Sequence, residues 1–240
     1  AFVEALQKMQ IEPVLHPQSD KEIFFILPRG VGVPEIPGYQ QGWFIVQDPS
    51  TIHAVNLLDP KTSEKVLDAC ASPGGKSVLI AERMQSAAGL TVMELHEDRL
   101  PRLEDNLMRM NISKAQIIQG DARYPKQSLK DKLFDAILLD VPCSNSGVLQ
   151  RRSDARWRIN QERLKALNTL QYDILNGCAH YVASGGRMVY STCSLEYEEN
   201  EGLIDKWIKK NPDFFLKDSI KILPWEAGSD GSFSALLCRS

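Results

Sequence analysis

From residue 47 onward, short apolar runs alternate with longer amphipathic segments along the chain. The apolar runs predict strands over 65–69, 90–95, 116–119, 134–139 and 187–191. Between them, apolar residues recur every three or four positions, which predicts helices over 76–85, 97–110 and 163–183. The first 46 residues are instead rich in Pro and Gly, and they predict only a short helix over 4–9 and a strand over 23–27. We therefore expect a small α+β lead-in subdomain over 1–46 and a larger domain over 47–240.

Strands that alternate with helices predict an α/β fold with a doubly wound, mostly parallel sheet. Ligands of such sheets bind outside the carboxyl ends of the strands, near the point where the strand order reverses. Chemically active side chains fall at these ends: Asp68, Glu94, Asp121, Asp140 and Cys193. This coincidence predicts a ligand site at that edge of the sheet.

The composition of the 240 residues is that of a globular protein, with 43% hydrophobic and 25% charged residues. No window of 18 consecutive apolar residues occurs, which excludes a membrane-spanning helix. The five cysteines contain no C-x-x-C pair, which argues against a disulfide framework and against a structural zinc site. We therefore expect no metal and a reducing, cytoplasmic location.

The net charge of −3 and the isoelectric point near 5.9 do not by themselves indicate nucleic-acid binding. The charge is nevertheless uneven along the chain. Residues 151–165 have a local balance of +4, and residues 194–205 carry five acidic residues and no basic one. A basic stretch can therefore serve an anionic partner in spite of the overall charge.

The turn after the first predicted strand, residues 68–76 (DACASPGGK), contains two glycines without either phosphate-binding spacing. It lacks the G-x-G-x-x-G of dinucleotide sites and the G-x-x-x-x-G-K-[ST] of phosphate loops. Glu94 lies 19 residues after Gly75, where a carboxylate that binds ribose hydroxyls is usual. These features favour a nucleoside without a phosphate chain. S-adenosylmethionine fits, with Asp121 able to accept from the adenine amine. The alternative is a simple tight turn and a Glu94 that is merely solvated.

Two cysteines follow predicted strands among small polar residues, in DVPCS (Cys143) and YSTCS (Cys193). A thiolate there suits cytosine chemistry, because its addition to carbon 6 turns carbon 5 into a nucleophile that can take a methyl group. Asp140 can protonate or hydrogen-bond the ring nitrogen during that addition. The remaining cysteines are expected to be small buried apolar side chains: Cys70, Cys178 and Cys238.

A series of motifs resembles the NOP/Sun family of RNA 5-methylcytosine methyltransferases, and within it the bacterial Sun-type (RsmB-like) 16S rRNA enzymes. The motifs are DACASPGGK, ELH, QGDARYP, FDAILLDVPCSNSGV, RRSDARW and YSTCSLEYEENE, and the similarity covers roughly residue 42 to the C-terminus. The resemblance implies a Rossmann-like catalytic domain over 47–240 that transfers a methyl group from S-adenosyl-L-methionine to carbon 5 of a cytosine in RNA. Sun-type members usually carry an additional N-terminal RNA-binding domain, so this chain, which starts Ala-Phe-Val, is expected to be the catalytic core of a longer protein.

The resemblance also implies roles for individual residues. Cys193 is the expected nucleophile, and Cys143 resembles the second cysteine that helps to resolve the covalent product. Asp140 matches the acid that contacts the cytosine edge, and Lys76 is sometimes given a catalytic role. The positions that match the S-adenosylmethionine pocket are Cys70, Ala71, Ser72, Pro73, Gly74, Gly75, Lys76, Glu94, Arg99, Asp121 and Asp140. Mild departures from the family pattern occur at Ser72, Glu94 and Ser153.

The basic stretch after the PCS motif is the expected RNA contact, because Arg pairs with phosphate and an aromatic ring can stack on an unpaired base. The residues concerned are Arg151, Arg152, Arg156 and Trp157. The alternative is a solvated helix cap with Trp157 packed into the core. The target cytosine must leave its stack to reach Cys193, so a loop, bulge or single strand is the expected substrate.

Ribosomal RNA is the first expectation for the substrate, and the same chemistry on transfer RNA stays open. A non-catalytic RNA-binding or assembly factor that retains the fold also stays open. An amino methyltransferase is disfavoured, because the tetrad at 140–143 is Asp-Val-Pro-Cys and offers no aromatic ring to hold the amine of a flipped base. We expect a monomer with no membrane contact.

Overall fold

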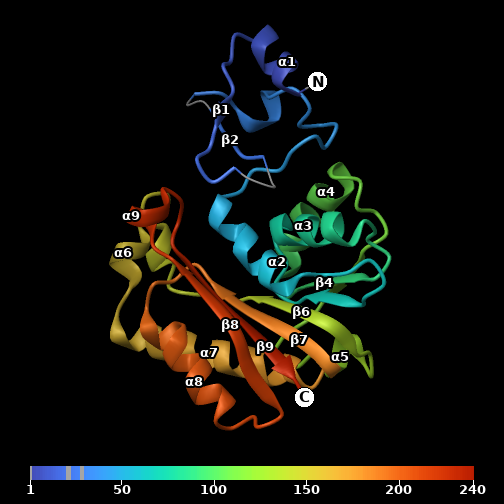
Figure 1. Cartoon of the computed structure of the whole chain (residues 1–240), viewed down its shortest axis with the longest axis vertical. Coiled ribbons are helices and arrows are strands. Elements are labelled where there is room, and N and C mark those ends of the chain that lie inside the picture. The colour runs from blue at the N-terminus through green and yellow to red at the C-terminus, as the bar shows by residue number, and fades with distance from the viewer. Residues whose placement is uncertain (1, 20–22, 28–29) are drawn as a thin grey trace.

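The computed structural model describes residues 2–19, 23–27 and 30–240, and a seven-stranded sheet forms its centre (Figure 1). The strand order is β5-β4-β3-β6-β7-β9-β8. The first five strands are parallel, and β9 pairs antiparallel with β7 and β8. The strands are β3 (Val66–Asp68), β4 (Leu90–Glu94), β5 (Gln116–Gln119), β6 (Phe134–Asp140), β7 (Val182–Thr192), β8 (Phe214–Ile222) and β9 (Ser232–Arg239). The predicted α/β fold with a mostly parallel sheet is confirmed.

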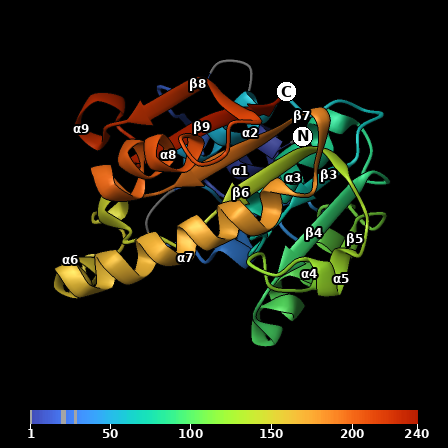
Figure 2. The same ribbon diagram turned by 90° about the horizontal axis from the view of Figure 1, so that it is seen from below.

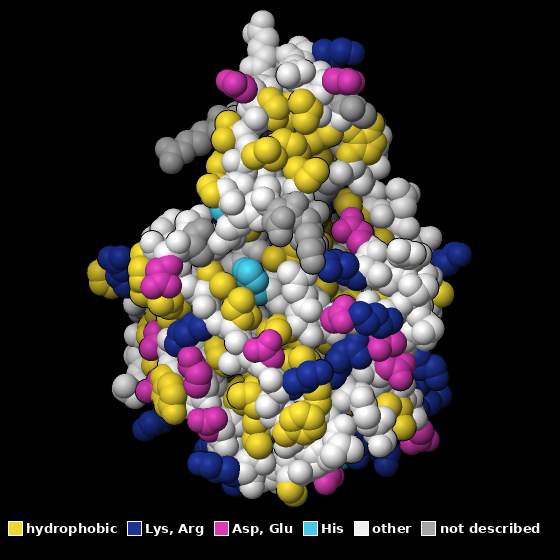
Figure 3. All heavy atoms as spheres, viewed as in Figure 1, with side chains coloured by type: hydrophobic (Ala, Val, Ile, Leu, Met, Phe, Trp, Pro, Cys, Tyr) yellow, Lys and Arg dark blue, Asp and Glu magenta, His cyan; other side chains and the backbone are white. Residues whose placement is uncertain are grey.

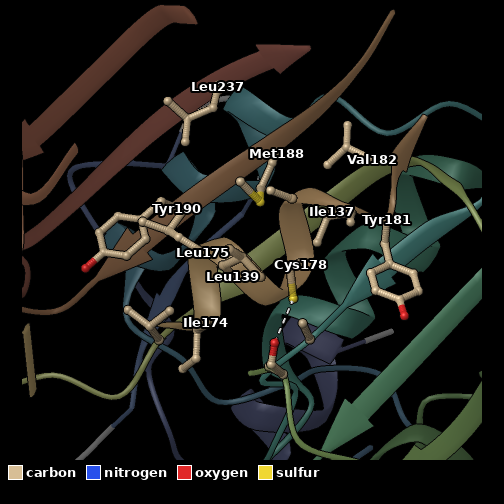
Figure 4. Packing of buried hydrophobic residues seen from close by; sticks show 14 of the residues in the cluster. Ile137, Leu139, Ile174, Leu175, Cys178, Tyr181, Val182, Met188, Tyr190 and Leu237 are labelled. Carbon is tan, nitrogen blue, oxygen red and sulfur yellow. Dashed lines mark hydrogen bonds between the residues drawn. The ribbon is translucent and has the colours of Figure 1, made fainter. Parts of the chain in front are cut away.

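Helices cover both faces of the sheet (Figure 2). One layer contains α2 (Ile52–Leu58), α3 (Gly75–Met84) and α4 (Leu100–Arg109), and the other contains α5 (Lys126–Leu129), α7 (Gln161–Ala179) and α8 (Glu201–Ile208). Successive side chains of a strand point to opposite faces. In β6, Leu138 therefore packs in the first layer, whereas Ile137 and Leu139 pack against α7 in the second (Figure 4). Burial on both faces explains the near-continuous apolar run of β6.

The N-terminal segment consists of α1 (Phe2–Lys8) and a two-stranded antiparallel pair, β1 (Val14–Leu15) and β2 (Phe25–Ile26). α1 and β2 correspond to the helix and the strand predicted over 4–9 and 23–27, whereas β1 was not predicted. Hydrophobic side chains gather on this segment in Figure 3. Arg109 at the end of α4 donates to the carbonyl oxygens of Tyr39 (2.9 Å) and Phe44 (3.0 Å), which ties the segment to the sheet body.

Several predicted boundaries are wrong. The helix predicted over 163–183 ends at Ala179, and Val182 already belongs to β7. The Ser-Gly-Gly stretch at 184–186 lies inside β7 as an irregularity rather than before it, since the partners of β7 shift from Phe134 to Ala136 across it. Gly185 has a φ of 73° there, which glycine adopts without strain.

Two strands of the seven-stranded sheet, β8 and β9, were not predicted from the hydrophobic pattern. β8 is largely exposed, so it shows little of the alternation that marks a half-buried strand. Two short helices also lie in this half of the chain, α6 (Ala155–Arg158) and α9 (Pro224–Ala227). Within the described ranges, no helix is both long enough and apolar enough to cross a membrane.

Candidate active site

The carboxyl ends of the parallel strands meet at one edge of the sheet, where the sequence predicts a ligand site. β3 ends at Asp68, β4 at Glu94 and β6 at Asp140. Asp121 follows β5 by two residues, and Cys193 directly follows β7. The parallel register places these strand ends next to one another, so four carboxylates and a thiol border the same edge.

Cys143 and Cys193 meet at this edge, although 50 residues separate them in the chain. β6 and β7 are neighbours with Asp140 opposite Ser191, so the segments that leave the two strands start side by side. The two sulfur atoms lie 3.1 Å apart, within hydrogen-bonding distance. Cys143 is buried and Cys193 is partly exposed, which leaves Cys193 as the sulfur that an incoming substrate meets.

This contact gives the two thiols opposite acidities. The hydrogen bond from Cys143 lowers the pKa of Cys193, although burial and the charge of Asp140 oppose the change, and Lys76 adds to the lowering. The same hydrogen bond, together with burial, raises the pKa of Cys143 well above its ordinary value. The thiolate form is therefore favoured at Cys193 over Cys143, and the thiolate is the nucleophilic form of cysteine.

A pocket of about 240 Å³ opens beside Cys193. The charged residues that line it include the ion pair between Nζ of Lys76 and Oδ2 of Asp140, at 2.6 Å, and also Arg151, Arg152 and Asp230. Burial disfavours the charge of Lys76, but Asp140 and the nearby Cys193 outweigh it and raise the pKa of the amine. The pocket therefore presents an ammonium, a carboxylate and an acidic thiol to whatever enters it.

Asn145 belongs to the same pocket, and sequence reasoning misses it. Its φ of 63° is left-handed, a conformation that Asn tolerates better than most residues. In its protonated form, Cys193 donates from Sγ to the side-chain oxygen of Asn145 at 3.1 Å, and Nδ2 of Asn145 donates to the carbonyl of Cys143 at 3.1 Å. An Asn two residues after Cys143 was the available signal, since Asn is favoured where the chain must turn in this way.

The turn after β3 has the form of a ligand cradle. Gly74 has a φ of 103°, and a Cβ on Gly75 would come within 3.0 Å of Oε1 of Gln47. Oδ2 of Asp68 accepts from Oγ of Ser77 at 2.6 Å. Among the described residues, the buried Oδ1 of Asp68 and Oε1 of Gln47 have no hydrogen-bond partner. Two unpaired buried acceptors beside the turn fit a ligand with N–H donors, such as the amino group of S-adenosylmethionine.

The other acids predicted for the cofactor lie in ordered settings. Glu94 is only 5% exposed, and its Oε1 accepts from the backbone N–H of His96 at 2.9 Å, so the alternative of a merely solvated Glu94 is wrong. Arg123 donates to both oxygens of Asp121 and, chiefly through these hydrogen bonds, lowers the pKa of that carboxyl. Arg99 is exposed at the end of the short 3-10 helix Glu97–Arg99 that follows β4.

Replacing Glu94 by Gln should weaken binding of S-adenosylmethionine by roughly 1–3 kcal/mol, the range for a charge-assisted hydrogen bond. The amide keeps the size of the side chain and can still accept from His96, so the fold should persist. Isothermal titration calorimetry measures the change, with circular dichroism as the folding control. An unchanged affinity would show that the acid of β4 does not contact the cofactor.

Asp68 should make the stability of the free protein depend on pH. Burial raises its pKa from 3.8 to about 6, against the hydrogen bond from Ser77. Because the folded pKa lies above the unfolded one, the stabilisation present at low pH is lost as pH rises through the folded value. Replacing Asp68 by Asn should therefore change the stability more favourably at pH 8 than at pH 5, by about 1 kcal/mol in urea unfolding. Equal effects at the two pH values would contradict the raised pKa.

In the basic stretch, one arginine is ion-paired within the protein, and two others are exposed to solvent. Arg151 pairs with Asp48 at 2.5 Å and with Asp230 at 3.0 Å, so its guanidinium already joins two distant parts of the chain. Arg152 and Arg156 are exposed. Trp157 of α6 is 84% exposed, and the alternative that packs it into the core is wrong.

The fold and this site together define an α/β methyltransferase-type protein with two cysteine sulfurs 3.1 Å apart at the ligand edge of its sheet. A family model described as 16S rRNA methyltransferase RsmB/F matches residues 55–237, and the chain belongs to this family. It is 36% identical over 244 residues to ribosomal RNA small subunit methyltransferase B of Vibrio vulnificus, covering 99% of this chain and 56% of that protein. The protein of the same name from Citrobacter koseri is 40% identical over 214 residues, covering 86% and 50%. The chain thus spans about half the length of these relatives.

Solved structures agree with this assignment. The crystal structure of NSun6 from Pyrococcus horikoshii with SFG has a TM-score of 0.77 and 26% identity, covering 91% of this chain and 59% of that one. A methyltransferase homolog protein from Pyrococcus horikoshii has a TM-score of 0.80 and 25% identity, covering 99% and 81%. The resemblance stated from the motifs is confirmed.

Proposed function

We propose that this chain transfers a methyl group from S-adenosyl-L-methionine to carbon 5 of a cytosine in RNA, with ribosomal RNA as the substrate. The observation that carries the proposal is the cysteine pair, with its sulfurs 3.1 Å apart and only Cys193 made more acidic. A thiolate beside a carboxylate is what addition to a cytosine ring requires. Membership of the RsmB/F family and relatives named as ribosomal RNA methyltransferases support the choice of RNA.

In the proposed reaction, Sγ of Cys193 bonds to carbon 6 of the cytosine, and the electron pair of the 5,6 double bond moves to carbon 5. The ring nitrogen takes a proton in this step: Lys76, whose Nζ lies 2.6 Å from Oδ2 of Asp140, gives its proton to Asp140, and Asp140 passes it to the ring nitrogen. S-adenosylmethionine supplies the electrophilic methyl group that carbon 5 takes. A water molecule then accepts the carbon 5 proton, the electron pair of that C–H bond restores the 5,6 double bond, and the bond between carbon 6 and sulfur breaks to release the Cys193 thiolate. The ring nitrogen returns its proton to Asp140.

The cofactor would bind along the turn after β3 and the ends of β4 and β5. The unpaired oxygens of Asp68 and Gln47 would accept from its amino group, and Glu94 would hold its ribose hydroxyls. The contact set that we propose is Cys70, Ala71, Ser72, Pro73, Gly74, Gly75, Lys76, Glu94, Arg99, Asp121 and Asp140. We further propose that residues 1–46 form the lead-in subdomain of a catalytic domain over 47–240, acting as a monomer in the cytoplasm.

In the proposed RNA complex, Arg152 and Arg156 contact phosphates and Trp157 stacks on a base. Arg151 is one of the residues that line the pocket. Replacing Arg152 and Arg156 by Ala should weaken RNA binding and lower its log–log salt slope by roughly 0.7 for each lost contact to a single strand. Fluorescence anisotropy over a salt series measures both. Arg158→Ala is the matched control, because Arg158 is paired with Asp154. A wild-type slope in the double variant would identify these arginines as solvated surface.

The direct test of the proposed function is methyl transfer from labelled cofactor to transcripts of 16S rRNA and of tRNA, followed by nucleoside mass spectrometry. We expect labelled 5-methylcytidine from the 16S rRNA. Label confined to tRNA would show that the substrate is tRNA instead of rRNA. Label in N4-methylcytidine would show that the methyl group goes to the exocyclic amine and not to carbon 5. No label in either RNA would favour a non-catalytic role.

A further inference from the structure

The acidic stretch at 194–205 places one of its members inside the protein. Glu199 is fully buried, whereas its neighbour Glu198 is exposed. A buried carboxylate is costly unless several donors surround it, so its donors show which groups it was placed to hold. Those donors come from the two cysteine motifs and from α7.

Each carboxylate oxygen of Glu199 accepts from a residue next to one of the cysteines. Oε1 accepts from the backbone N–H of Ser144 at 3.0 Å, and Ser144 directly follows Cys143. Oε2 accepts from the hydroxyl of Ser194 at 2.6 Å, and Ser194 directly follows Cys193. One side chain therefore ties together two loops that are 50 residues apart.

Gln171 of α7 extends the link on the Cys143 side. Its Nε2 donates both to Oε1 of Glu199, at 2.8 Å, and to the carbonyl of Pro142, at 2.9 Å. The residues before and after Cys143 are thus both held through this cluster. Tyr190 fixes the backbone of the acid itself, because its hydroxyl donates to the carbonyl of Glu199 at 2.6 Å.

Building on the proposed function, we propose that Glu199 is a positioning residue, which holds the two cysteine loops in register so that the thiol of Cys143 donates to the sulfur of Cys193. Sulfur atoms on two separate loops do not keep a hydrogen bond unless the backbones that carry them are fixed. Its charge also acts on the pair. After the hydrogen bond to Cys193 and burial, the negative charge of Glu199 adds to the raised pKa of Cys143, which keeps the proton on that sulfur.

The test compares Glu199→Gln with the exposed neighbour variant Glu198→Gln. The amide keeps the volume of the side chain, but it loses the charge and presents a donor on one side in place of an acceptor. Iodoacetamide alkylation of Cys193, followed by peptide mass spectrometry across pH, reads the acidity of the thiol without RNA or cofactor. We expect Glu199→Gln to raise the apparent pKa of Cys193 by about 1 unit, as the hydrogen bond from Cys143 weakens. Glu198→Gln should match the wild type.

A second variant, Ser194→Ala, removes the hydroxyl that donates to Glu199, together with its hydrogen bonds to Ser144, Ser146 and the backbone N–H of Glu196, and it should shift the profile in the same direction. Because both variants lose the hydrogen bond between Ser194 and Glu199, the shift of the double variant should be smaller than the sum of the two single shifts. In turnover, Glu199→Gln should lower kcat by about tenfold while KM for RNA and cofactor stays within about twofold.

A folded Glu199→Gln with the wild-type alkylation profile would overturn the proposal. Should that variant fail to fold, a wild-type profile in Ser194→Ala would overturn it equally. The alkylation readout separates this proposal from the proposed function. If the alkylation profile of Glu199→Gln is shifted but the wild-type protein methylates no RNA, the positioning role of Glu199 would stand and the proposed reaction would be wrong.

Discussion

We expect Cys193→Ala to lose RNA methylation by at least about a thousandfold, as removal of a covalent nucleophile does in other enzymes. Without Sγ of Cys193, nothing in the pocket can add to carbon 6, and carbon 5 is not nucleophilic enough to take a methyl group unaided. Transfer of labelled methyl groups measures the loss. RNA containing 5-fluorocytosine adds a second readout, because fluorine replaces the proton that must leave and so traps the covalent adduct.

The control for this experiment is Cys238→Ala, which removes a cysteine of β9 outside the pocket lining. It should methylate RNA and trap the fluorinated substrate as the wild type does. Methylation by Cys193→Ala at a rate near that of the wild type would refute the nucleophile assignment and with it the reaction scheme.

Cys143→Ala should produce the opposite behaviour and accumulate a covalent enzyme–RNA complex with ordinary cytosine. The S–H of Cys143 donates to the sulfur of Cys193 and makes it a better leaving group. Without this donor, attack slows but still occurs, whereas expulsion of the thiolate becomes the slow step. Denaturing gel electrophoresis after incubation with RNA and cofactor measures the accumulated complex. Accumulation in Cys193→Ala instead would mean that the two roles are reversed.

Much of the fold could be predicted from the sequence because its strands are buried on both faces. Apart from Asp135, the segment Phe134–Asp140 that forms β6 is apolar up to its last residue, Asp140, so both the strand and the acid at its end follow from the pattern. β8 could not be predicted in this way, because this edge strand is largely exposed and its apolar and polar residues do not alternate. The end of α7 was misplaced because Ser-Gly-Gly is typical of a turn, yet here it forms an irregular part of β7.

The candidate site divides along a similar line. Cys143 and Cys193 stand out in the sequence because each follows a strand among small polar residues. Their 3.1 Å contact depends on the pairing of β6 with β7, which a linear pattern does not contain. The burial of Glu199 could not be predicted either, because nothing in the sequence distinguishes it from the exposed Glu198 beside it. Arg151 is ion-paired with Asp48, which lies 103 residues away in the chain. A count of charges along the sequence does not reveal this pair and therefore predicts only an RNA contact for Arg151.

The most direct test of the proposed reaction is to determine which cysteine carries the trapped adduct. After reaction with 5-fluorocytosine RNA and S-adenosylmethionine, nuclease and trypsin digestion leaves a modified peptide for mass spectrometry. Cys143 and Cys193 fall on different tryptic peptides, because Arg151 and Arg187 lie between them. The account predicts the nucleotide adduct on Sγ of Cys193 alone. An adduct on Cys143, or the absence of any adduct from an enzyme that still methylates RNA, would contradict it.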